Sequence, residues 1–401
     1  MKTICGIFYV SAEEGRANSD VFGLARLLAK RDYQVHLVCL KNGRVRKNGS
    51  NKNVYIYPVL NVFSLHRFII KPLIGVIENI VMIGRIIVKS KAEIVIASSD
   101  FPVLIAVVFL QKIIKKRIVL YCRELSIEKY LRYTQKTSGI SKLERKLMSV
   151  YINLLRRFRI WAIKKPNYVL SMDLGIREYF FKEFRGEVEI EYMPPVVDVD
   201  VFNPFINGRK ARGKLNLHDD DLVILYLGAL APYRRIDILV KAFSYIVKEH
   251  PNARLMIGGM GKKDHLVRLA KQLNLDKYVL FLSWLPYAQI PELIAASDIC
   301  VDPYPRSGIE EFQLSLKILE YMAVGKCVIA AKNRGNMQLI QDGFNGMLLT
   351  PDSVEDLKCK ITQLIVDKKL REKLGKMAWI TVKEKHSGIE SLKVLEEKLI
   401  K

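Results

Sequence analysis

A serine, a lysine and a glutamate stand close together in the last third of the chain, at Ser315, Lys317 and Glu320. They fall in an amphipathic segment that follows a Pro-rich loop and stops at Gly325. We expect Ser315 to be the N-cap of a helix, so that the N–H groups of Leu316 and Lys317 face an anion such as a diphosphate. The carboxylate of Glu320, about one and a half turns into the helix, could accept hydrogen bonds from a ribose diol. These residue types predict a site for a nucleoside diphosphate.

The elements around this segment alternate between strands and helices. Short apolar runs predict strands at Ile299–Val301, Cys327–Ala331 and Met347–Leu349, and the amphipathic pattern predicts a helix over Ser315–Val324. Such alternation is typical of a parallel sheet, in which ligands bind at the carboxyl ends of the strands, against helix N-termini. The expected fold class is therefore α/β.

The sequence "LSLKILEYMAVGKCVIAA", followed by "LIQDGFNGMLL", resembles the donor-binding segment of family-4 retaining glycosyltransferases. In that family the glutamate that matches Glu320 binds the ribose of the nucleotide. Two family prolines are replaced, by Leu316 and Cys327, and a Pro-Glu-Leu-Ile sequence is replaced by residues 337–340. The resemblance implies a GT-B fold, which consists of two Rossmann-like domains around a cleft. It also implies transfer of a sugar from a UDP- or GDP-sugar to an acceptor hydroxyl with retention, without a metal or a cofactor.

The sequence "LGALAPYRRIDILVKAF" resembles the family segment whose arginine and lysine bind the donor diphosphate and stabilise it as it departs. The arginine position is Ala229 here, the lysine position is Arg234, and the glycine after it is Arg235. One cation is therefore lost, or moved to Arg235. An arginine suits the task, because its planar guanidinium binds phosphate bidentately and stays charged. The resemblance thus gives Arg234 a catalytic and a donor-binding role, with Arg235 as a second donor-binding candidate.

Three further positions resemble donor-side features of the family by their place in the chain. Gly259 lies in a Gly-rich loop after a strand, and Leu285 lies near the end of the next strand, where the family's backbone recognises the base. The family often has an acidic residue eight positions before Glu320, where it touches the donor sugar. That position is Phe312 here, so the preceding Glu311 is the candidate for a catalytic carboxylate in a shifted loop.

The first half of the chain resembles the family in architecture only. Gly15 is the one glycine left in the loop after the first strand, where the family has paired glycines. It either contacts the diphosphate and acceptor or belongs to an ordinary βα loop. A later strand ends in Arg123-Glu124, where the family has an acidic residue or a histidine near the transferred sugar. Glu124 is either the active-site carboxylate or the partner of Arg123 in a strand-end ion pair.

The Pro-rich sequence "MPPVVDVDVFNP" resembles the family's linker between domains, and its prolines stiffen the backbone. We therefore expect an acceptor-side domain over residues 1–195 and a nucleotide-sugar-binding domain over 196–375. A terminal helix over 376–401 is expected to pack back on the first domain. The "DVD" at 198–200 looks like a metal motif but lies within the linker pattern, so we assign it a structural role and predict no metal site.

The net charge of +24, from 65 basic and 41 acidic residues, predicts an anionic partner. A nucleic-acid partner is not expected, since the chain has no zinc-finger spacing, RNA-binding signature or basic zipper. The basic run 142–165 carries apolar residues at spacings of three and four, which suits an anionic membrane surface. The alternative is a helix packed on its own sheet with a solvated basic face. A second apolar and basic stretch at 65–89 favours the membrane.

These features together predict a glycosyltransferase at the cytoplasmic face of a membrane, acting on a glycan or lipid-linked acceptor. The six cysteines are scattered without a Cys-x-x-Cys pair, as in a reduced cytosolic enzyme. The N-terminus does not read as a signal peptide. The most apolar stretch, 68–88, contains three charges and a proline, which argues against a spanning helix. Because Ala229 and Phe312 depart from the family pattern, the alternative is a GT-B-shaped nucleotide-sugar-binding protein without catalysis.

Overall fold

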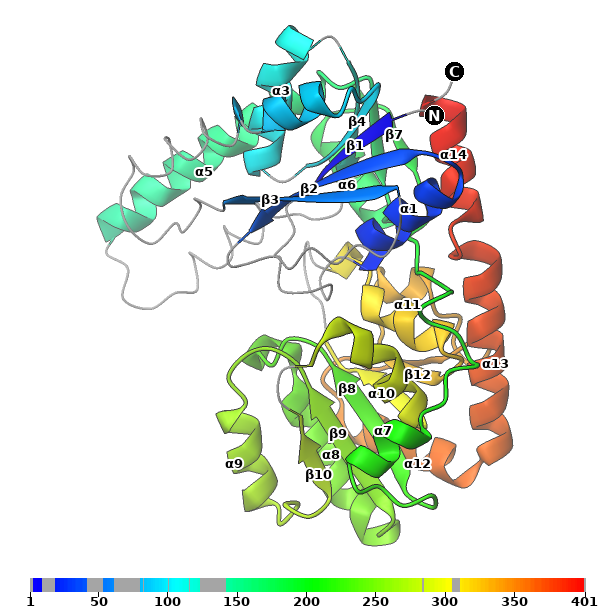
Figure 1. Ribbon diagram of the computed structural model, residues 1–401. Coiled ribbons are helices and arrows are strands. Elements are labelled where there is room, and N and C mark those ends of the chain that lie inside the picture. Colours follow the sequence, from blue (N-terminus) through cyan, green and yellow to red (C-terminus); the bar gives the residue numbers. More distant parts are fainter. Residues whose placement is uncertain are drawn as a thin grey trace. The chain divides into compact units, whose positions relative to one another are not determined.

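The computed structural model describes residues 3–8, 19–41, 53–60, 80–81, 83–99, 101–114, 116–122, 142–282, 285–304 and 311–399. The contacts divide the chain into two compact units. The first consists of Met1–Val196 and Gly388–Lys401, and the second of Val197–Ser387. Each unit is a parallel sheet flanked by helices (Figure 1), which confirms the α/β class.

The first unit contains a seven-stranded sheet in the order β3-β2-β1-β4-β5-β6-β7. Its strands are β1 (Thr3–Phe8), β2 (Gln34–Lys41), β3 (Val54–Leu60), β4 (Ile94–Ser98), β5 (Arg117–Cys122), β6 (Tyr168–Ser171) and β7 (Ile190–Tyr192). Its described helices include α1 (Ser19–Lys30), α3 (Phe101–Ile114), α5 (Lys142–Ile163), α6 (Leu174–Glu183) and α14 (Ile389–Leu399). All five residues of β4 are buried, as expected for a parallel strand covered on both faces.

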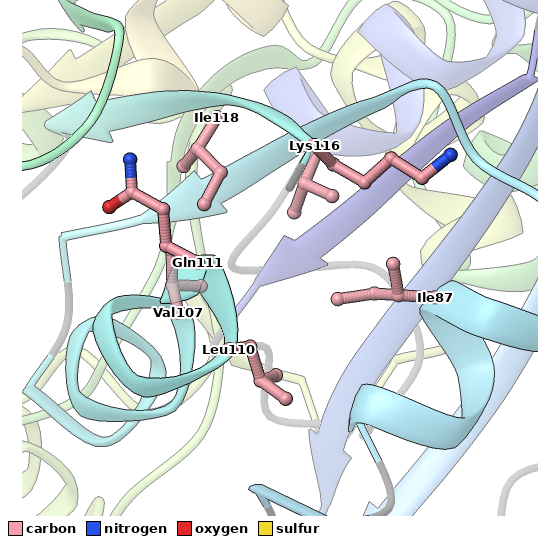
Figure 2. A pocket seen from close by; sticks show the side chains of 7 residues that line it. Ile87, Val107, Leu110, Gln111, Lys116 and Ile118 are labelled. Carbon is pink, nitrogen blue, oxygen red and sulfur yellow. The ribbon is translucent and has the colours of Figure 1, made fainter. Parts of the chain in front are cut away.

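A small, mainly apolar pocket lies in the first unit beside α3 and β5 (Figure 2). Its lining consists of Ile87, Val95, Val107, Leu110, Gln111, Lys116 and Ile118. The Gln111 amide donates to the carbonyl of Lys165 at 2.7 Å, so it ties α3 to the residues after α5. Ligand sites need several converging polar groups, and this lining offers little more than Gln111 and Lys116. We therefore interpret the pocket as a packing gap.

The second unit contains a six-stranded sheet in the order β10-β9-β8-β11-β12-β13. Its strands are β8 (Leu222–Leu227), β9 (Ala253–Gly258), β10 (Val279–Phe281), β11 (Ile299–Asp302), β12 (Cys327–Ala331) and β13 (Met347–Leu349). Its helices are α7 (Arg209–Lys214), α8 (Ile236–Glu249), α9 (Asp264–Gln272), α10 (Ile290–Ala296), α11 (Leu316–Ala323), α12 (Val354–Val366) and α13 (Lys368–Lys385), with short turns η1 (Pro232–Arg234), η2 (Tyr287–Gln289) and η4 (Asn336–Gln338). The strands and the helix that the sequence predicted after residue 298 are confirmed by β11, β12, β13 and α11.

Two apolar clusters form the core of the second unit, one on each face of the sheet. Ile224 and Tyr226 of β8 belong to one cluster, and Val223, Leu225 and Leu227 belong to the other. Successive strand side chains point to opposite faces, so this apolar run feeds both clusters at once. The strand order reverses at β8, which lies between β9 and β11. In doubly wound sheets the crevice for a ligand opens at the carboxyl ends of the strands that flank such a reversal.

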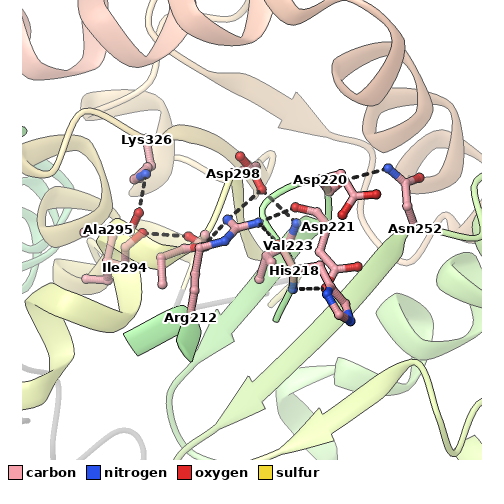
Figure 3. A network of polar contacts seen from close by, with 12 residues as sticks. Arg212, His218, Asp220, Asp221, Val223, Asn252, Ile294, Ala295, Asp298 and Lys326 are labelled. Atoms are coloured by element: carbon pink, nitrogen blue, oxygen red, sulfur yellow. Dashed lines mark hydrogen bonds and ion pairs between the residues drawn. The ribbon is translucent and has the colours of Figure 1, made fainter. Parts of the chain in front are cut away.

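A polar network holds the other end of these strands together (Figure 3). Arg212 of α7 donates to the carbonyl oxygens of Ala296, at 2.9 Å, and Asp221. Its guanidinium also lies 3.7 Å from the carboxylate of Asp298. That carboxylate accepts a hydrogen bond from the N–H of Val223 at 2.8 Å. The network thus fixes the starts of β8 and β11, from which both strands run toward the crevice.

The last helix, α14, belongs to the first unit. Ser391 donates to the carbonyl of Pro194 at 2.7 Å, and Leu392 and Leu395 are buried. Position 376, where the sequence placed the start of a terminal helix, lies inside α13, which the second unit contains. The chain returns to the first unit only at Gly388. Among the helices that the structure describes, none is both long and apolar enough to cross a membrane.

The Leu395→Ala substitution tests how firmly α14 is anchored. Because Leu395 is buried, the substitution leaves a cavity, and we expect it to lower the free energy of unfolding by about 2–5 kcal/mol. Ile389 on the same helix is largely exposed, so Ile389→Ala should change the free energy of unfolding by about 0.5 kcal/mol or less. Urea unfolding followed by circular dichroism measures both. Equal, small effects would show that α14 contributes little to the first unit.

Candidate functional site

The carboxyl end of β11 carries Asp302, whose carboxylate has no exposed surface. The hydroxyl of Ser315 donates to its Oδ2 at 2.6 Å, and the ammonium of Lys317 donates to its Oδ1 at 3.1 Å. Ser315 occupies the N-cap position of α11 with an extended backbone, but its side chain makes no capping hydrogen bond. The sequence was therefore right about its position and wrong about its partner. An unpaired buried carboxylate costs more than a lost cap, so the hydroxyl serves Asp302.

Lys317 reaches from the first turn of α11 to the end of β8. Its Nζ lies 4.4 Å from the ring centroid of Tyr226, whose hydroxyl donates to the carbonyl of Ala229 at 3.0 Å. A Cβ atom at Gly228 would lie 2.8 Å from this Nζ. The ammonium is therefore held between a carboxylate, an aromatic face and a glycine that leaves room for it.

The loops after β8 and β9 approach each other as closely as glycine allows. A Cβ atom at Gly259 would lie 1.5 Å from the carbonyl oxygen of Gly228, and Gly259 has a φ of +152°. Leu285, which follows β10, packs nearby, with its Cδ1 3.3 Å from where a Cβ at Gly258 would stand. The sequence predicted Gly259 and Leu285 as donor-side positions. The structure places both where strands β9 and β10 end.

Arg234 ends the η1 turn that follows β8. Its guanidinium carbon lies 4.4 Å from the ring centroid of Tyr304 and 5.2 Å from that of Tyr233. Within the part of the chain that the structure describes, its buried Nε has no hydrogen-bond partner. Burial lowers the pKa of this guanidinium, but neighbouring groups, with Asp302 among them, raise it above its usual value. Arg234 thus stays charged, and its guanidinium lies over the faces of two rings.

The neighbouring Arg235 is in a different situation. It has a left-handed backbone, with a φ of 54°, just before α8. Its Nε donates to Asp237 at 3.2 Å, and its Nη1 pairs with Asp352. Burial lowers the pKa of Arg235, but these two carboxylates outweigh that effect and raise it. Its charge is compensated within the unit, so Arg234 is the better placed of the two to meet a ligand.

Glu320 lies on α11, about one and a half turns beyond Ser315, and is buried. The next residue, Tyr321, ties the helix to β8. Its hydroxyl accepts from the N–H of Leu227 at 2.9 Å and donates to the carbonyl of the same residue at 3.3 Å. The backbone around Glu320 is therefore fixed relative to the end of β8, close to Lys317 and Leu316 at the helix start.

Glu311 lies beside Arg334, with 3.8 Å between Oε1 and Nε. Its carbonyl accepts from the N–H of Gly335 at 2.9 Å. The neighbouring Phe312 has its ring 5.0 Å from the Arg334 guanidinium. Glu311 is thus in contact with a cation of the loop after β12, and its expected role toward a sugar stays a prediction.

Gly15 and Glu124 lie outside the residues that the structure describes, and so does Arg123. Their roles stay predictions. Across the described ranges, no group of three or more His, Cys, Asp or Glu side chains is arranged to hold a metal ion.

Sequence reasoning missed three residues of this site: Asp302, Tyr226 and Tyr304. The signal for Asp302 was present, because a charged residue at the end of an apolar strand of a parallel sheet lies at the ligand edge. Tyr226 and Tyr304 carry no such signal. Tyrosines in or after apolar runs are common in cores, and only the fold brings these two beneath cations.

The Gly259→Ala substitution tests the close approach of the two loops. The added carbon would overlap the carbonyl oxygen of Gly228, so the loops must separate. We expect a loss of about 2 kcal/mol or more in the free energy of unfolding. A Cβ atom at Gly213 in α7 would have nothing within 4 Å, and Gly213→Ala should be neutral or stabilise by up to about 1 kcal/mol. Thermal unfolding compares them, and a neutral Gly259→Ala would contradict this packing.

Comparisons with known proteins agree with this architecture. Residues 208–379 match the family model described as "Glycosyl transferases group 1". An uncharacterised glycosyltransferase of Methanocaldococcus jannaschii is 24% identical over 232 residues, which cover 57% of each chain. A protein of Mycolicibacterium smegmatis named GDP-mannose-dependent alpha-(1-6)-phosphatidylinositol monomannoside mannosyltransferase is 26% identical over 203 residues, which cover 50% of this chain and 53% of that protein. The chain thus spans about half the length of the curated relatives it matches.

Solved structures resemble the chain over its whole length. Sucrose-phosphate synthase from Thermosynechococcus elongatus matches with a TM-score of 0.76 at 16% identity, covering 100% of this chain and 99% of that one. HepE from Anabaena, solved in complex with UDP-glucose, matches with a TM-score of 0.69 at 16% identity, covering 99% of each chain. At such identities the likeness shows the fold. The chain has the GT-B fold, and its residues 208–379 are similar to the glycosyl transferases group 1 family.

Proposed function

We propose that this protein is a retaining glycosyltransferase that moves a sugar from a UDP- or GDP-sugar to an acceptor hydroxyl. The observation that carries the proposal is the pair of cations, Arg234 and Lys317, beside the N-terminus of α11. Lys317 is paired with Asp302, so Arg234 supplies the charge that is not compensated by a hydrogen-bonded carboxylate in the described part of the chain. Negative charge grows on the diphosphate as its bond to the sugar breaks. Positioned cations and helix N–H groups stabilise that charge. Such a pair can do this without a metal ion.

The remaining residues of the site have roles that follow from their positions. Glu320 accepts hydrogen bonds from the ribose, and Gly259 lets the backbone come close to the donor. Leu285 lies where the base would be recognised. Arg235 supports the η1 turn through Asp237 and Asp352 rather than binding phosphate directly. Glu311, and Glu124 in the first unit, remain candidates for contacts with the sugar and the acceptor.

The names of the relatives support the choice of donors to test. The Anabaena structure contains UDP-glucose, and the mannosyltransferase of Mycolicibacterium smegmatis is named as dependent on GDP-mannose. Both donors present a ribose and a diphosphate, which are the groups that Glu320 and the two cations would bind. Other contacts select the identity of the sugar and of the base, so both donors are tested.

A second candidate function is nucleotide-sugar binding without catalysis. Ala229 and Phe312 stand where the resembled family has charged residues, and Phe312 packs against Arg334. A protein with this function would bind the donor and never transfer or hydrolyse its sugar. Turnover with an acceptor extract separates the two candidates.

We further propose that α5 rests on an anionic membrane at its cytoplasmic side, which would bring a lipid-linked glycan acceptor to the first unit. Val150, Leu154 and Trp161 are 53%, 58% and 45% exposed, and their spacing places them on one face of α5. The basic face is only partly free for lipid, because Arg156 and Arg159 pair with Glu183 of α6.

This pairing corrects part of the sequence interpretation, since some of the basic residues in 142–165 serve the packing of the first unit. The exposed Arg157, and Lys165 above the ring of Trp161, are cations beside the apolar face that could reach lipid phosphates. The second stretch, 65–89, is described only from residue 80 on, without residue 82.

Substitutions of Glu320 and Arg234 should affect different steps of the reaction. Glu320→Ala removes hydrogen bonds to the ribose, each worth about 1.5–3 kcal/mol, and should weaken nucleotide binding by about tenfold or more. Arg234→Ala removes a charge that binds the diphosphate and matters even more as it departs, so donor affinity should fall by about tenfold and turnover by far more. Calorimetry with UDP and GDP and a transfer assay measure the two effects. Wild-type nucleotide affinity in Glu320→Ala would place the donor elsewhere.

Membrane binding through α5 can be measured by co-sedimentation with vesicles. The protein should sediment with vesicles rich in anionic lipid, and 1 M salt should release it, because the screening length falls to about 3 Å. Leu154→Ser combined with Trp161→Ala should reduce binding. Phe205→Ser, which removes a highly exposed aromatic residue of the second unit, should not. Equal binding to neutral vesicles would count against the proposal, and tight duplex DNA binding would favour a nucleic-acid role.

A further inference from the structure

The two adjacent arginines of the site are held by different kinds of contact. Arg235 is paired with the carboxylates of Asp237 and Asp352. Arg234 instead lies against aromatic rings, 4.4 Å from the centroid of Tyr304 and 5.2 Å from that of Tyr233. In the described part of the chain its buried Nε has no hydrogen-bond partner. The contrast between neighbours in one turn calls for a physical reason.

An aromatic ring and a carboxylate engage different parts of a guanidinium. A carboxylate accepts from one or two of the in-plane N–H groups and compensates the positive charge, so less of either remains for a ligand. A ring attracts the cation electrostatically through its face and leaves the N–H groups at the edge of the plane free to donate. A guanidinium held by rings is therefore fixed in place while its donors and its charge remain for an anion.

Tyr304 is suited to be the fixed wall of this arrangement. It follows the end of β11 by two residues and is buried, whereas Tyr233 is largely exposed. The two rings meet edge to face, with centroids 5.7 Å apart and an interplanar angle of 61°. The backbone of Arg234 is fixed as well, because the next residue, Arg235, is anchored by Asp237 and Asp352. The side chain of Arg234 is then the part that can still move, and the Tyr304 ring restricts it.

We infer that Tyr304 is a positioning residue that holds the guanidinium of Arg234 by its ring face and aims its N–H edge at a diphosphate. The inference rests on the proposed function, and it adds a residue that the sequence pattern does not indicate. Tyr304 touches no reacting atom. Tyr304 should influence ligand binding only through Arg234. Its replacement should therefore weaken binding only of ligands that carry a diphosphate, and a ring without the phenol oxygen should suffice.

The first experiment compares a nucleoside diphosphate with its nucleoside, using calorimetry with UDP and uridine, or with GDP and guanosine if the wild type binds GDP. Tyr304→Leu should weaken binding of the diphosphate by about tenfold, within the range of a partly desolvated cation–π contact, and change nucleoside binding by about twofold at most. Tyr304→Phe keeps the ring and should restore most of the affinity.

The same unit offers a matched control. Tyr278 has the guanidinium of Arg254 5.6 Å from its ring centroid, near the start of β10. Tyr278→Leu also removes a cation–π contact and changes the side-chain volume by the same amount as Tyr304→Leu. Tyr278 precedes the first residue of β10, whereas the site lies where the strands end. Tyr278→Leu should lower the melting temperature without changing the ratio of diphosphate to nucleoside affinity. Tyr233→Leu changes an exposed residue that folding tolerates, and it should lower the diphosphate affinity by about threefold.

A double-mutant cycle with Arg234→Gln tests the route of the effect. If Tyr304 acts through Arg234, Tyr304→Leu should cost little further diphosphate affinity once Arg234 is replaced. Additive losses would overturn the inference, and so would wild-type diphosphate affinity in both Tyr304→Leu and Tyr233→Leu. The proposed function fails separately, when the wild type binds neither UDP nor GDP. If Glu320→Ala loses nucleotide and the tyrosine variants do not, the donor site stands and the positioning role falls.

Discussion

The second unit is organised around one buried negative charge. Asp302 has no exposed surface, and a carboxylate removed from water must be paired and hydrogen-bonded or it destabilises the fold by several kcal/mol. The protein meets this requirement with Ser315 and Lys317, which are both at the start of α11. The position of α11 relative to β11 is thereby fixed. The same two contacts turn the hydroxyl of Ser315 away from the helix N–H groups that it could cap and direct Lys317 toward the end of β8.

This constraint explains why glycine and tyrosine surround the site. Where Lys317 meets Asp302, its ammonium group lies beside Gly228, at which a side chain would collide with it, and over the ring of Tyr226. Tyr321, one residue beyond Glu320, then locks α11 to the backbone of Leu227. Charge, packing and backbone hydrogen bonds all join the ends of β8 and β11. Those ends flank the strand-order reversal, where doubly wound sheets bind their ligands.

The sequence predicted those features of the unit that depend on local pattern. Apolar runs and the stop at Gly325 located β11, α11, β12 and β13 because each is decided within a few residues. Partners far apart in the chain could not be read in this way. Asp302 and Ser315 are 13 residues apart, and Arg235 and Asp352 are 117 apart. The sequence therefore placed Ser315 correctly and missed its acceptor.

The same limit applies to α5, where the amphipathic pattern predicted a helix and a basic face. Only the fold shows that Arg159 is buried against Glu183, which lies 24 residues further along the chain. A pattern counts charges, but it does not show which charges are already neutralised. Arg234 and Arg235 illustrate the point most directly, because they are adjacent and identical in type, yet only Arg235 pairs with the distant Asp352 while Arg234 lies over the ring of Tyr304.

Arg212 and Arg234 show how the two ends of one sheet differ in what they leave for a ligand. Arg212 donates through its Nη atoms to the carbonyls of Ala296 and Asp221 and lies beside Asp298, so its charge stabilises the starts of the strands. Arg234, where the strands end, is partly buried and held by ring faces. Burying part of a cation without a hydrogen-bond acceptor is unfavourable, and no described contact of the Arg234 Nε offsets this cost. An anion bound where the strands end would offset this cost, because it would accept hydrogen bonds from the N–H groups of the guanidinium. At the amino ends of the strands, the charge of Arg212 thus stabilises the fold. At their carboxyl ends Lys317 and Arg235 are paired with carboxylates, whereas Arg234 is held by ring faces, which leaves it as the cation that the proposed diphosphate would meet.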